Sequence, residues 1–111
     1  MIKPVQLFKC LSDDTRLHAC ILIATEGELC VCELMEALDD SQPKISRHLA
    51  QLRSCGILDD SRRGQWVYYA IAKDLPQWAI DIIHITCETK QEAVQQFQDN
   101  LKVMKNRPRC C

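Results

Sequence analysis

The segment that most constrains the fold of this chain spans residues 28–56, where the pattern predicts two short helices joined by a polar turn. The first helix ends at two adjacent acids, Asp39 and Asp40, which disfavour another helical turn. The second opens at Ser41, a favoured N-cap residue, with Pro43 in the first turn, where a missing N–H costs nothing. We therefore interpret the rest of the chain as a scaffold that supports this helix pair.

The second helix, over about residues 42–54, has two faces of different character. Ile45, Leu49 and Leu52 follow the i, i+4, i+7 spacing of one buried stripe. The opposite face is basic, amide-bearing and slim, and it consists of Pro43, Lys44, Arg47, Ala50 and Gln51. Such a face suits a DNA major groove, because Arg and Lys reach guanine edges or phosphates and Gln pairs with adenine. Taken alone, the helix is equally well explained as a surface helix with a solvated face.

A β-hairpin is predicted over about residues 57–71, directly after this helix. Arg62, Arg63 and Gly64 form its expected turn, and the returning strand alternates and is rich in Trp, Val and Tyr. A hairpin with two arginines at its tip, next to a candidate recognition helix, has the character of a wing. The alternative is a plain surface hairpin with a solvated tip.

Helices are also predicted on both sides of this unit. One spans residues 4–11, and a second runs from residue 13 to about residue 25, with Ser12 as its N-cap and Gly27 as its stop. A long last helix is expected over about residues 75–105, with Asp74 as its cap. The chain thus has helical segments at both ends that can serve assembly.

The last helix carries an apolar seam with spacings of 4, 7, 3, 4 and 3 residues, formed by Ile83, Cys87, Val94, Phe97, Leu101 and Met104. This seam is longer than a domain of 111 residues can cover alone, so we expect it to pack against its symmetry mate and the first helix. The prediction is one domain over residues 1–111, mainly α with a β-hairpin. It is a winged helix-turn-helix that forms a homodimer through its terminal helices, with the recognition helices about one DNA turn apart.

The formal net charge of −1 gives no sign of a nucleic-acid partner, but the charge is unevenly distributed. Residues 41–73 carry six basic side chains against two acidic ones, a net charge of +4. Residues 11–40 carry one basic side chain against eight acidic ones, a net charge of −7. The basic segment can follow DNA phosphates, and the acidic segment should stay away from them.

Eight cysteines are spread along the chain, at positions 10, 20, 30, 32, 55, 87, 110 and 111. The N-terminal sequence has no apolar stretch typical of an export signal, and no run approaches the roughly 18 apolar residues of a membrane helix. We therefore expect a cytoplasmic protein with reduced thiols and no membrane partner. Cys30 and Cys32 can act as soft ligands or simply pack. On a regular helix they would point about 200° apart, so chelation of one ion would require the first turn to unwind.

Three stretches of the sequence resemble the ArsR/SmtB family of metal-responsive repressors, and most closely its arsenical-resistance operon repressors (ArsR). They are Ser-Gln-Pro-Lys-Ile-Ser-Arg-His-Leu-Ala at 41–50, Glu-Leu-Cys-Val-Cys-Glu-Leu at 28–34 and Gly-Gln-Trp-Val-Tyr-Tyr at 64–69. The likeness extends from Leu7 to about Trp78. It implies a repressor whose apo dimer binds operator DNA. Binding of As(III) or Sb(III) to cysteine thiolates would release the DNA and derepress an arsenic-resistance operon.

The resemblance also implies particular site residues. The metalloid ligands would be Cys30 and Cys32. Those repressors typically have a third cysteine where this chain has Met35, so a third sulfur would have to come from elsewhere, with Cys110 or Cys111 as the leading candidates. The expected DNA contacts are Ser41, Gln42, Lys44, Ser46, Arg47, His48, Gln51, Arg62 and Arg63.

Two other functions compete with this one: a sensor of a divalent soft metal such as cadmium, lead or zinc, and a repressor controlled by thiol oxidation. Trivalent arsenic ranks first because a three-coordinate pyramidal ion is satisfied by two or three sulfurs more easily than a tetrahedral ion is by four. Enzymatic activity, catalytic residues and an organic cofactor are not expected. The sequence has no Cys-x-x-Cys pair, no Gly-rich phosphate loop and no HExxH motif.

Overall fold

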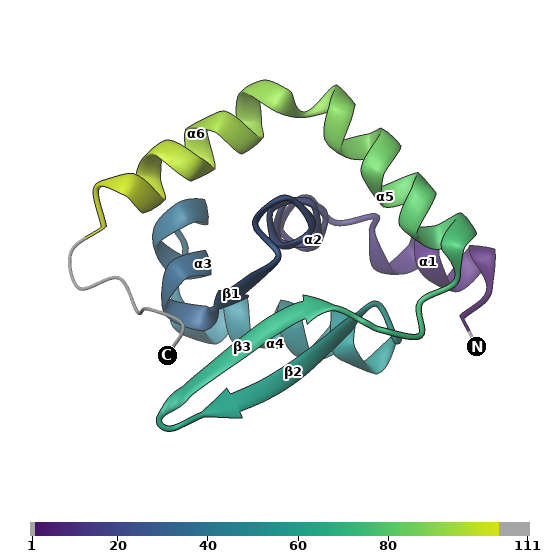
Figure 1. Cartoon of the computed structure of the whole chain (residues 1–111), viewed down its shortest axis with the longest axis horizontal. Coiled ribbons are helices and arrows are strands. Elements are labelled where there is room, and N and C mark those ends of the chain that lie inside the picture. The colour runs from purple at the N-terminus through teal and green to yellow at the C-terminus, as the bar shows by residue number, and fades with distance from the viewer. Residues whose placement is uncertain (1, 105–111) are drawn as a thin grey trace.

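The structure of the protein is a computed structural model that describes residues 2–104. Its helices are α1 (Pro4–Cys10), α2 (Asp14–Glu26), α3 (Val31–Leu38), α4 (Gln42–Ser54), α5 (Gln77–Thr89) and α6 (Gln91–Lys102). Its strands are β1 (Glu28–Cys30), β2 (Leu58–Arg63) and β3 (Trp66–Ile71). Figure 1 shows α2 near the centre, with α5 and α6 arching over one side of it and the sheet on the other. The predicted class, mainly α with a β-hairpin, is confirmed.

Helix α2 forms the centre of the core because it is apolar on nearly all sides. Residues 19–23 are five consecutive positions, each at most 1% exposed. A helix buried all round shows little amphipathic periodicity, so α2 has a weaker sequence signal than α4. Its N-cap is Asp13 rather than the expected Ser12, because Asp13 Oδ1 accepts a hydrogen bond from the backbone N–H of Arg16 at 3.0 Å. Gly27 ends the helix as expected, with a φ of 96° that favours glycine.

Strand β1 occupies a segment that the sequence pattern assigned to the start of a helix. The three strands form one antiparallel sheet in the order β1-β3-β2. Cys30, the last residue of β1, pairs in register with Tyr68 of β3. A strand of three residues is too short to show alternation, which is why the pattern did not reveal it. The consequence is that Cys30 lies before helix α3 and not within it.

The hairpin of β2 and β3 is confirmed, but its turn lies further along the chain than expected. Both Arg62 and Arg63 pair with residues of β3 and therefore belong to β2. The turn itself is formed by Gly64 and Gln65, and Gly64 has a φ of 62°. The two arginines are thus on neighbouring strand positions and point to opposite faces of the sheet.

Helix α4 has the expected bounds and the expected start. Its N-cap is Ser41, whose Oγ accepts a hydrogen bond from the backbone N–H of Lys44 at 3.4 Å. The predicted apolar stripe is buried, with at most 1% exposed at Ile45, Leu49 and Leu52. Through this stripe α4 packs against α2, α3 and β2, so its opposite face is left outward.

The last helix, expected to run unbroken to about residue 105, is two helices that meet at Lys90. The backbone of Lys90 has φ −118° and ψ 25°, which is not helical. Thr86 and Thr89 donate their hydroxyls to carbonyls three or four residues earlier, both at 2.7 Å, and such local bonds bend or weaken a helix. Helix α5 also starts after Pro76 as its N-cap, and not at Asp74.

The break changes what the apolar seam does. Helix α6 turns across α3, where Asn100 Nδ2 donates to the carbonyl oxygen of Ala37 at 2.9 Å. Ile83, Val94 and Leu101 of the seam are at most 7% exposed within a single chain. The single chain therefore buries half of the seam itself and leaves Cys87, Phe97 and Met104 partly buried, and packing of the seam against a symmetry mate stays a prediction.

Candidate DNA-binding surface and thiol site

The outward face of α4 presents most of the side chains predicted to contact DNA. Those that lie there, exposed or half-buried, are Ser41, Gln42, Lys44, Ser46, Arg47 and Gln51. Lys44 Nζ lies 2.9 Å from Asp40 Oδ2, and Gln42 Nε2 donates to Ser46 Oγ at 2.8 Å. Exposed pairs of this kind contribute little free energy, so these side chains can exchange their partners for a ligand.

His48 lies elsewhere than predicted, because its side chain is buried. The residue is 7% exposed, and its Nδ1 lies 3.2 Å from both Arg16 Nη1 and Gln51 Oε1. Its Nε2 lies 3.9 Å from Asp13 Oδ1. The imidazole therefore fastens α4 to the N-terminal end of α2 and does not face outward, which corrects its assignment as a direct DNA contact.

Arg16 is a structural link that the sequence pattern did not single out. Its Nε donates to the carbonyl oxygen of Cys10 at 2.6 Å, and its Nη1 donates to Gln51 Oε1 at 2.9 Å. One side chain of α2 thus holds the end of α1 and the outward face of α4. The signal that could have revealed it is its place as the one basic residue among the eight acids of residues 11–40.

The two arginines of β2 have different environments. Arg62 is exposed, as a wing contact requires. Arg63 Nη1 and Nη2 each donate to one carboxylate oxygen of Glu28, both at 2.6 Å, and its guanidinium carbon lies 4.7 Å from the centre of the Tyr68 ring. A bidentate pair stacked on an aromatic ring holds its arginine in one orientation. Arg63 therefore fastens the hairpin to β1, which sets it apart from its neighbour.

Cys30 occupies the corner between β1 and α3. It is 1% exposed and is the N-cap of α3, with an extended backbone at φ −89° and ψ 168°. Its sulfur accepts a hydrogen bond from the backbone N–H of Glu33, and Glu33 Oε1 accepts one from the N–H of Cys30 at 3.0 Å. This reciprocal arrangement is a capping box in which a thiol replaces the usual hydroxyl. Burial raises the pKa of Cys30 to about 11, so the sulfur is a neutral thiol at physiological pH.

Cys32 is the other predicted ligand, and it lies in the first turn of α3, half-buried. Because Cys30 precedes the helix, the helical angle of about 200° that separated the two sulfurs does not apply. Met35 lies one turn further along α3 and packs partly buried against the core. Within residues 2–104, no group of three or more His, Cys, Asp or Glu side chains is placed to hold an ion. Cys110 and Cys111, predicted to supply a third sulfur, lie outside the described residues.

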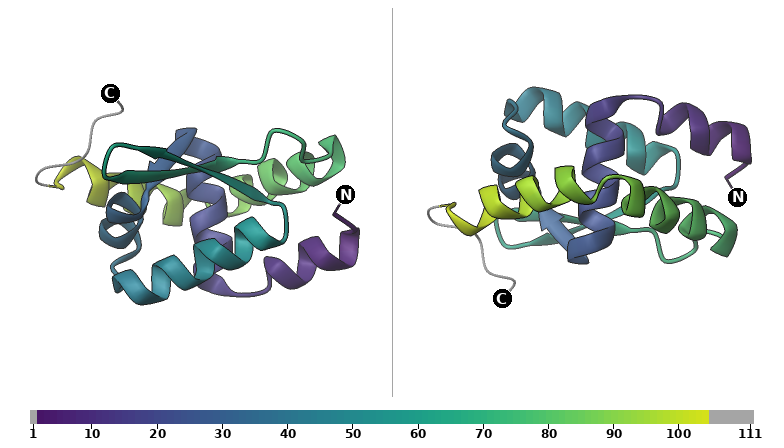
Figure 2. Two further views of the ribbon diagram at one scale, coloured as in Figure 1. Left: turned by 90° about the horizontal axis from the view of Figure 1, so that it is seen from below. Right: turned by 90° about the horizontal axis from the view of Figure 1, so that it is seen from above.

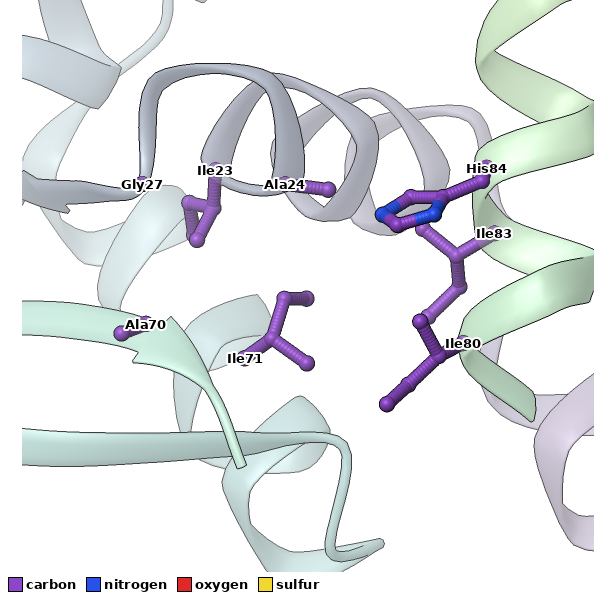
Figure 3. A pocket seen from close by; sticks show the side chains of 8 residues that line it. All are labelled: Ile23, Ala24, Gly27, Ala70, Ile71, Ile80, Ile83 and His84. Atoms are coloured by element: carbon purple, nitrogen blue, oxygen red, sulfur yellow. The ribbon is translucent and has the colours of Figure 1, made fainter. Parts of the chain in front are cut away.

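A small cavity of about 280 Å³ lies between α2, β3 and α5, away from both surfaces described above. Figure 3 shows its lining, in which Ile23, Ile80 and Ile83 surround the opening and the His84 ring lies at one side. The lining is otherwise apolar. Its histidine has no acidic or thiol neighbour in the lining, so this cavity offers no ligand set for a metal ion.

Comparison with known proteins gives one family match and several close relatives. Residues 13–60 match the model described as bacterial regulatory protein, arsR family. The chain is 55% identical over 108 residues to the arsenic resistance transcriptional regulator ArsR2 of Pseudomonas putida, a match that covers 97% of this chain and 94% of that protein. It is 52% identical over 98 residues to the arsenical resistance operon repressor of Escherichia coli K12, with 88% and 84% covered.

A solved structure shows the same arrangement of elements. The crystal structure of the AntR antimony-specific transcriptional repressor matches this chain with a TM-score of 0.66 and 31% identity, covering 82% of this chain and 79% of that one. This likeness confirms the predicted winged helix-turn-helix fold. In the part of the chain that the structure describes, no helix is both long and apolar enough to cross a membrane.

Proposed function

The chain belongs to the arsR family of bacterial regulatory proteins, and from that premise we propose that it is a metalloid-responsive repressor that leaves its operator when As(III) or Sb(III) binds Cys30 and Cys32. The family is one of transcriptional regulators and not of enzymes. The observation that carries the proposal is the position of Cys30, whose sulfur caps α3, the helix that packs against α4. A ligand on that sulfur acts directly on the support of the DNA-binding helix.

The operator-binding surface is the outward face of α4 together with Arg62 of the wing. Arg47 is exposed there and can bind a guanine edge or a phosphate. Gln51 is held by Arg16 at 2.9 Å, so its amide is already oriented before DNA arrives. His48 and Arg63 act indirectly in this proposal, by holding α4 and the wing in place. Operator DNA is the partner, and the cytoplasm is where the protein would meet it.

We place the homodimer interface on α1 and α5, which lie at the same end of the molecule in both Figure 1 and Figure 2. Val5 and Phe8 of α1 are 63% and 54% exposed, and Ile85 of α5 is 62% exposed. Large apolar side chains that are exposed on a domain surface typically mark an interface. Phe8→Asp should dissociate the dimer in sedimentation experiments, because the new charge would be desolvated without a partner. Val103→Asp, at an exposed apolar residue beyond α6, is the matched control and should remain dimeric.

The chemistry of Cys30 favours a metalloid hydroxide over a bare divalent cation. In water As(III) is a neutral hydroxide, and each As–O bond is exchanged for an As–S bond while the hydroxide takes the thiol proton and leaves as water. A buried neutral thiol meets this requirement without prior ionisation. A divalent cation must instead expel the proton of each thiol into solution, which the raised pKa of Cys30 opposes.

Release follows from the loss of the capping box. Ligation together with Cys32 would draw the Cys30 sulfur out of the position from which it accepts the N–H of Glu33, so the first turn of α3 would lose a cap and loosen. The same Cys30 backbone pairs with Tyr68 in β3, so a displaced Cys30 also disturbs the strand that carries the wing. Both DNA-binding elements are therefore coupled to one thiol. Among residues 2–104 the site has two sulfurs, and Cys110 or Cys111 remains our proposal for a third.

The deciding experiment is a titration of the protein–operator complex with arsenite, antimonite, cadmium and zinc under reducing conditions. Arsenite and antimonite should release the DNA at lower concentrations than either divalent cation. Release by cadmium or zinc at the lower concentration would make the protein a divalent-metal sensor. Release by an oxidant, with no response to any of the four, would make it a redox regulator.

A further inference from the structure

A second pair of cysteines, far apart in the sequence, meets where the C-terminal ends of α1 and α4 come together (Figure 2). Cys10 is the last residue of α1, and Cys55 is the residue that caps the end of α4. Both line one open cavity of about 620 Å³, whose rim includes Arg16, Arg47 and Gln51. This pair is separate from the thiol site at the start of α3.

The two thiols are held as neighbours by the structure around them. Cys10 Sγ donates to the carbonyl oxygen of Gln51 at 3.7 Å, and the backbone N–H of Cys55 donates to the same oxygen at 3.0 Å. Cys10 and Cys55 also line the same cavity. Arg16 also bridges the two helix ends, with its Nε 2.6 Å from the carbonyl oxygen of Cys10 and its Nη1 2.9 Å from Gln51 Oε1. The fold thus brings Cys10 and Cys55 to the same carbonyl oxygen and the same cavity.

We propose that Cys10 and Cys55 form a reversible disulfide, linking α1 to the end of α4, when the protein meets a hydroperoxide. Cys55 is half-buried and opens on the cavity, whereas Cys10 is 5% exposed, so Cys55 is the sulfur that the oxidant reaches. Its thiolate attacks the O–O bond, which gives a sulfenic acid on Cys55 and releases an alcohol, or water when the oxidant is hydrogen peroxide. The sulfur of Cys10 then displaces the sulfenic hydroxyl, which leaves with the Cys10 proton as water. Two thiols and one hydroperoxide become one disulfide, one alcohol and one water.

The environment of Cys10 suits the second of these steps. The pKa of Cys10 is raised to about 12, mainly by burial and also by neighbouring Cys55, while the charge of Arg16 acts in the opposite direction. Cys10 is therefore not the thiolate that attacks the oxidant. Once Cys55 carries a neutral sulfenic acid, its charge no longer opposes ionisation of Cys10, which leaves Arg16 as the nearby charge favouring the thiolate.

The disulfide should weaken operator binding, an expectation that rests on the proposed function. A sulfur–sulfur bond of about 2.05 Å is shorter than any non-bonded contact of two thiols, so we expect the ends of α1 and α4 to draw together. Arg47 and Gln51 lie on the rim of the cavity that would close. Their positions on the DNA-binding face would shift with the helix end.

Cys20, which is buried, and Cys87, which is half-buried, provide the contrast. Cys20 is 0% exposed, and Cys87 Sγ donates to the carbonyl oxygen of Ile21 at 3.8 Å. An oxidant has no open route to Cys20. Cys87→Ser is therefore a matched control, since it removes a partly buried thiol of the same fold without touching the cavity between α1 and α4.

The test uses the full reduced chain, treated with hydrogen peroxide, alkylated, digested and analysed by mass spectrometry. The expected product is a peptide pair linked through Cys10 and Cys55 that separates on reduction. Cys10→Ser and Cys55→Ser should each abolish it, and Cys87→Ser should retain it. Because Cys55 is half-buried, its serine variant decides the question if Cys10→Ser fails to fold. A link from Cys55 to any other cysteine, or a Cys55 that stops at sulfinic acid, would overturn the proposal.

Operator affinity of the oxidised protein provides the second readout. A several-fold loss is expected in the wild-type chain and none in Cys55→Ser. A disulfide that forms without any loss of affinity would refute its regulatory effect. A reduced protein that binds no operator would instead refute the proposed function, so the two failures are distinguishable.

Discussion

The β1–α3 corner and the α1–α4 junction each hold two cysteines, but they are built in different ways. At the corner, Cys30 and Cys32 are separated by one residue, and backbone hydrogen bonds of α3 engage the buried sulfur. At the junction, Cys10 and Cys55 come from distant segments and share one carbonyl oxygen of α4. In our proposals the corner would act on α4 through α3, whereas the junction touches α4 directly. Both cysteine pairs therefore lie where a change could reach the same helix.

The largest expected effect is on release of operator DNA by arsenite, and it follows from removing the two thiols of the corner. Cys30→Ser with Cys32→Ser should leave operator binding intact but abolish release by arsenite, because a serine hydroxyl cannot replace a soft sulfur ligand. The dose–response of a labelled operator complex measures this. Cys55→Ser, at the junction, is the matched control and should respond like the wild type. A double variant released at the wild-type arsenite concentration would move the sensing thiols away from the corner.

A smaller effect, on operator affinity, is expected from a residue of α4 that lies beside the α1–α4 junction. Arg47→Ala should weaken operator binding by about 1–3 kcal/mol, because the exposed guanidinium meets a base edge or a phosphate. Arg53→Ala is the control from the same helix, since Arg53 already pairs with Asp60 at 2.9 Å. Affinity is measured by fluorescence anisotropy at fixed salt. Equal losses in the two variants would mean that α4 contributes only diffuse charge.

Arg62 and Arg63 of the wing are expected to have different effects, because only Arg63 is bound to β1, the strand that leads into the corner. Arg62→Ala should weaken operator binding and reduce the salt dependence by about one ion, with little change in stability. Arg63→Ala should reduce the free energy of unfolding by about 1 kcal/mol, because it breaks a partly exposed bidentate pair with Glu28. Urea denaturation and salt-dependent binding separate the two effects. If Arg63→Ala weakened operator binding and Arg62→Ala reduced stability, Arg63 would instead be the residue on the DNA.

The smallest expected effect concerns the cap of α2, beside the junction. Asp13→Ala should cost about 1 kcal/mol at neutral pH, because it removes the acceptor for the N–H of Arg16. That hydrogen bond holds the pKa of Asp13 below its usual value. The contribution is therefore present above the unfolded pKa and is lost as the pH falls through the lower folded pKa. Urea denaturation at neutral and acidic pH should show that the free energies of unfolding of the wild type and of Asp13→Ala become equal in acid. A difference that persists there would mean that the carboxylate charge is not what stabilises the cap.

Much of the fold could be predicted from local pattern. Helix α4 matched its predicted bounds, because Ser41, Pro43 and a regular apolar stripe are all signals within one short window. The hairpin was visible for the same reason, although its turn lay two residues later than expected. Strand β1 and the break at Lys90 were missed, because a three-residue strand and a break without Gly or Pro leave almost no local signal.

The candidate site shows the same division between local and long-range information. The sequence placed Cys30 and Cys32 together and put Arg47 and Gln51 on an outward face, because these relations depend on positions a few residues apart. It could not separate Arg62 from Arg63, since their difference depends on whether Glu28 of another strand lies opposite. The sequence also placed His48 on the outer face of α4, whereas in the structure its imidazole packs against Arg16 of α2.

By itself, the sequence of this protein determined the helix pair, the wing, the family and the thiol pair at the start of α3. Tertiary structure alone decided that Cys30 caps α3 from a strand, that the last helix breaks at Lys90 and packs part of its apolar seam against α2 and α3, and that Cys10 lies beside Cys55. The physical reason is the range of the interactions. Helical periodicity and capping act over a few residues and leave a repeating pattern, whereas the packing of α1 against the end of α4 depends on how every intervening element is placed.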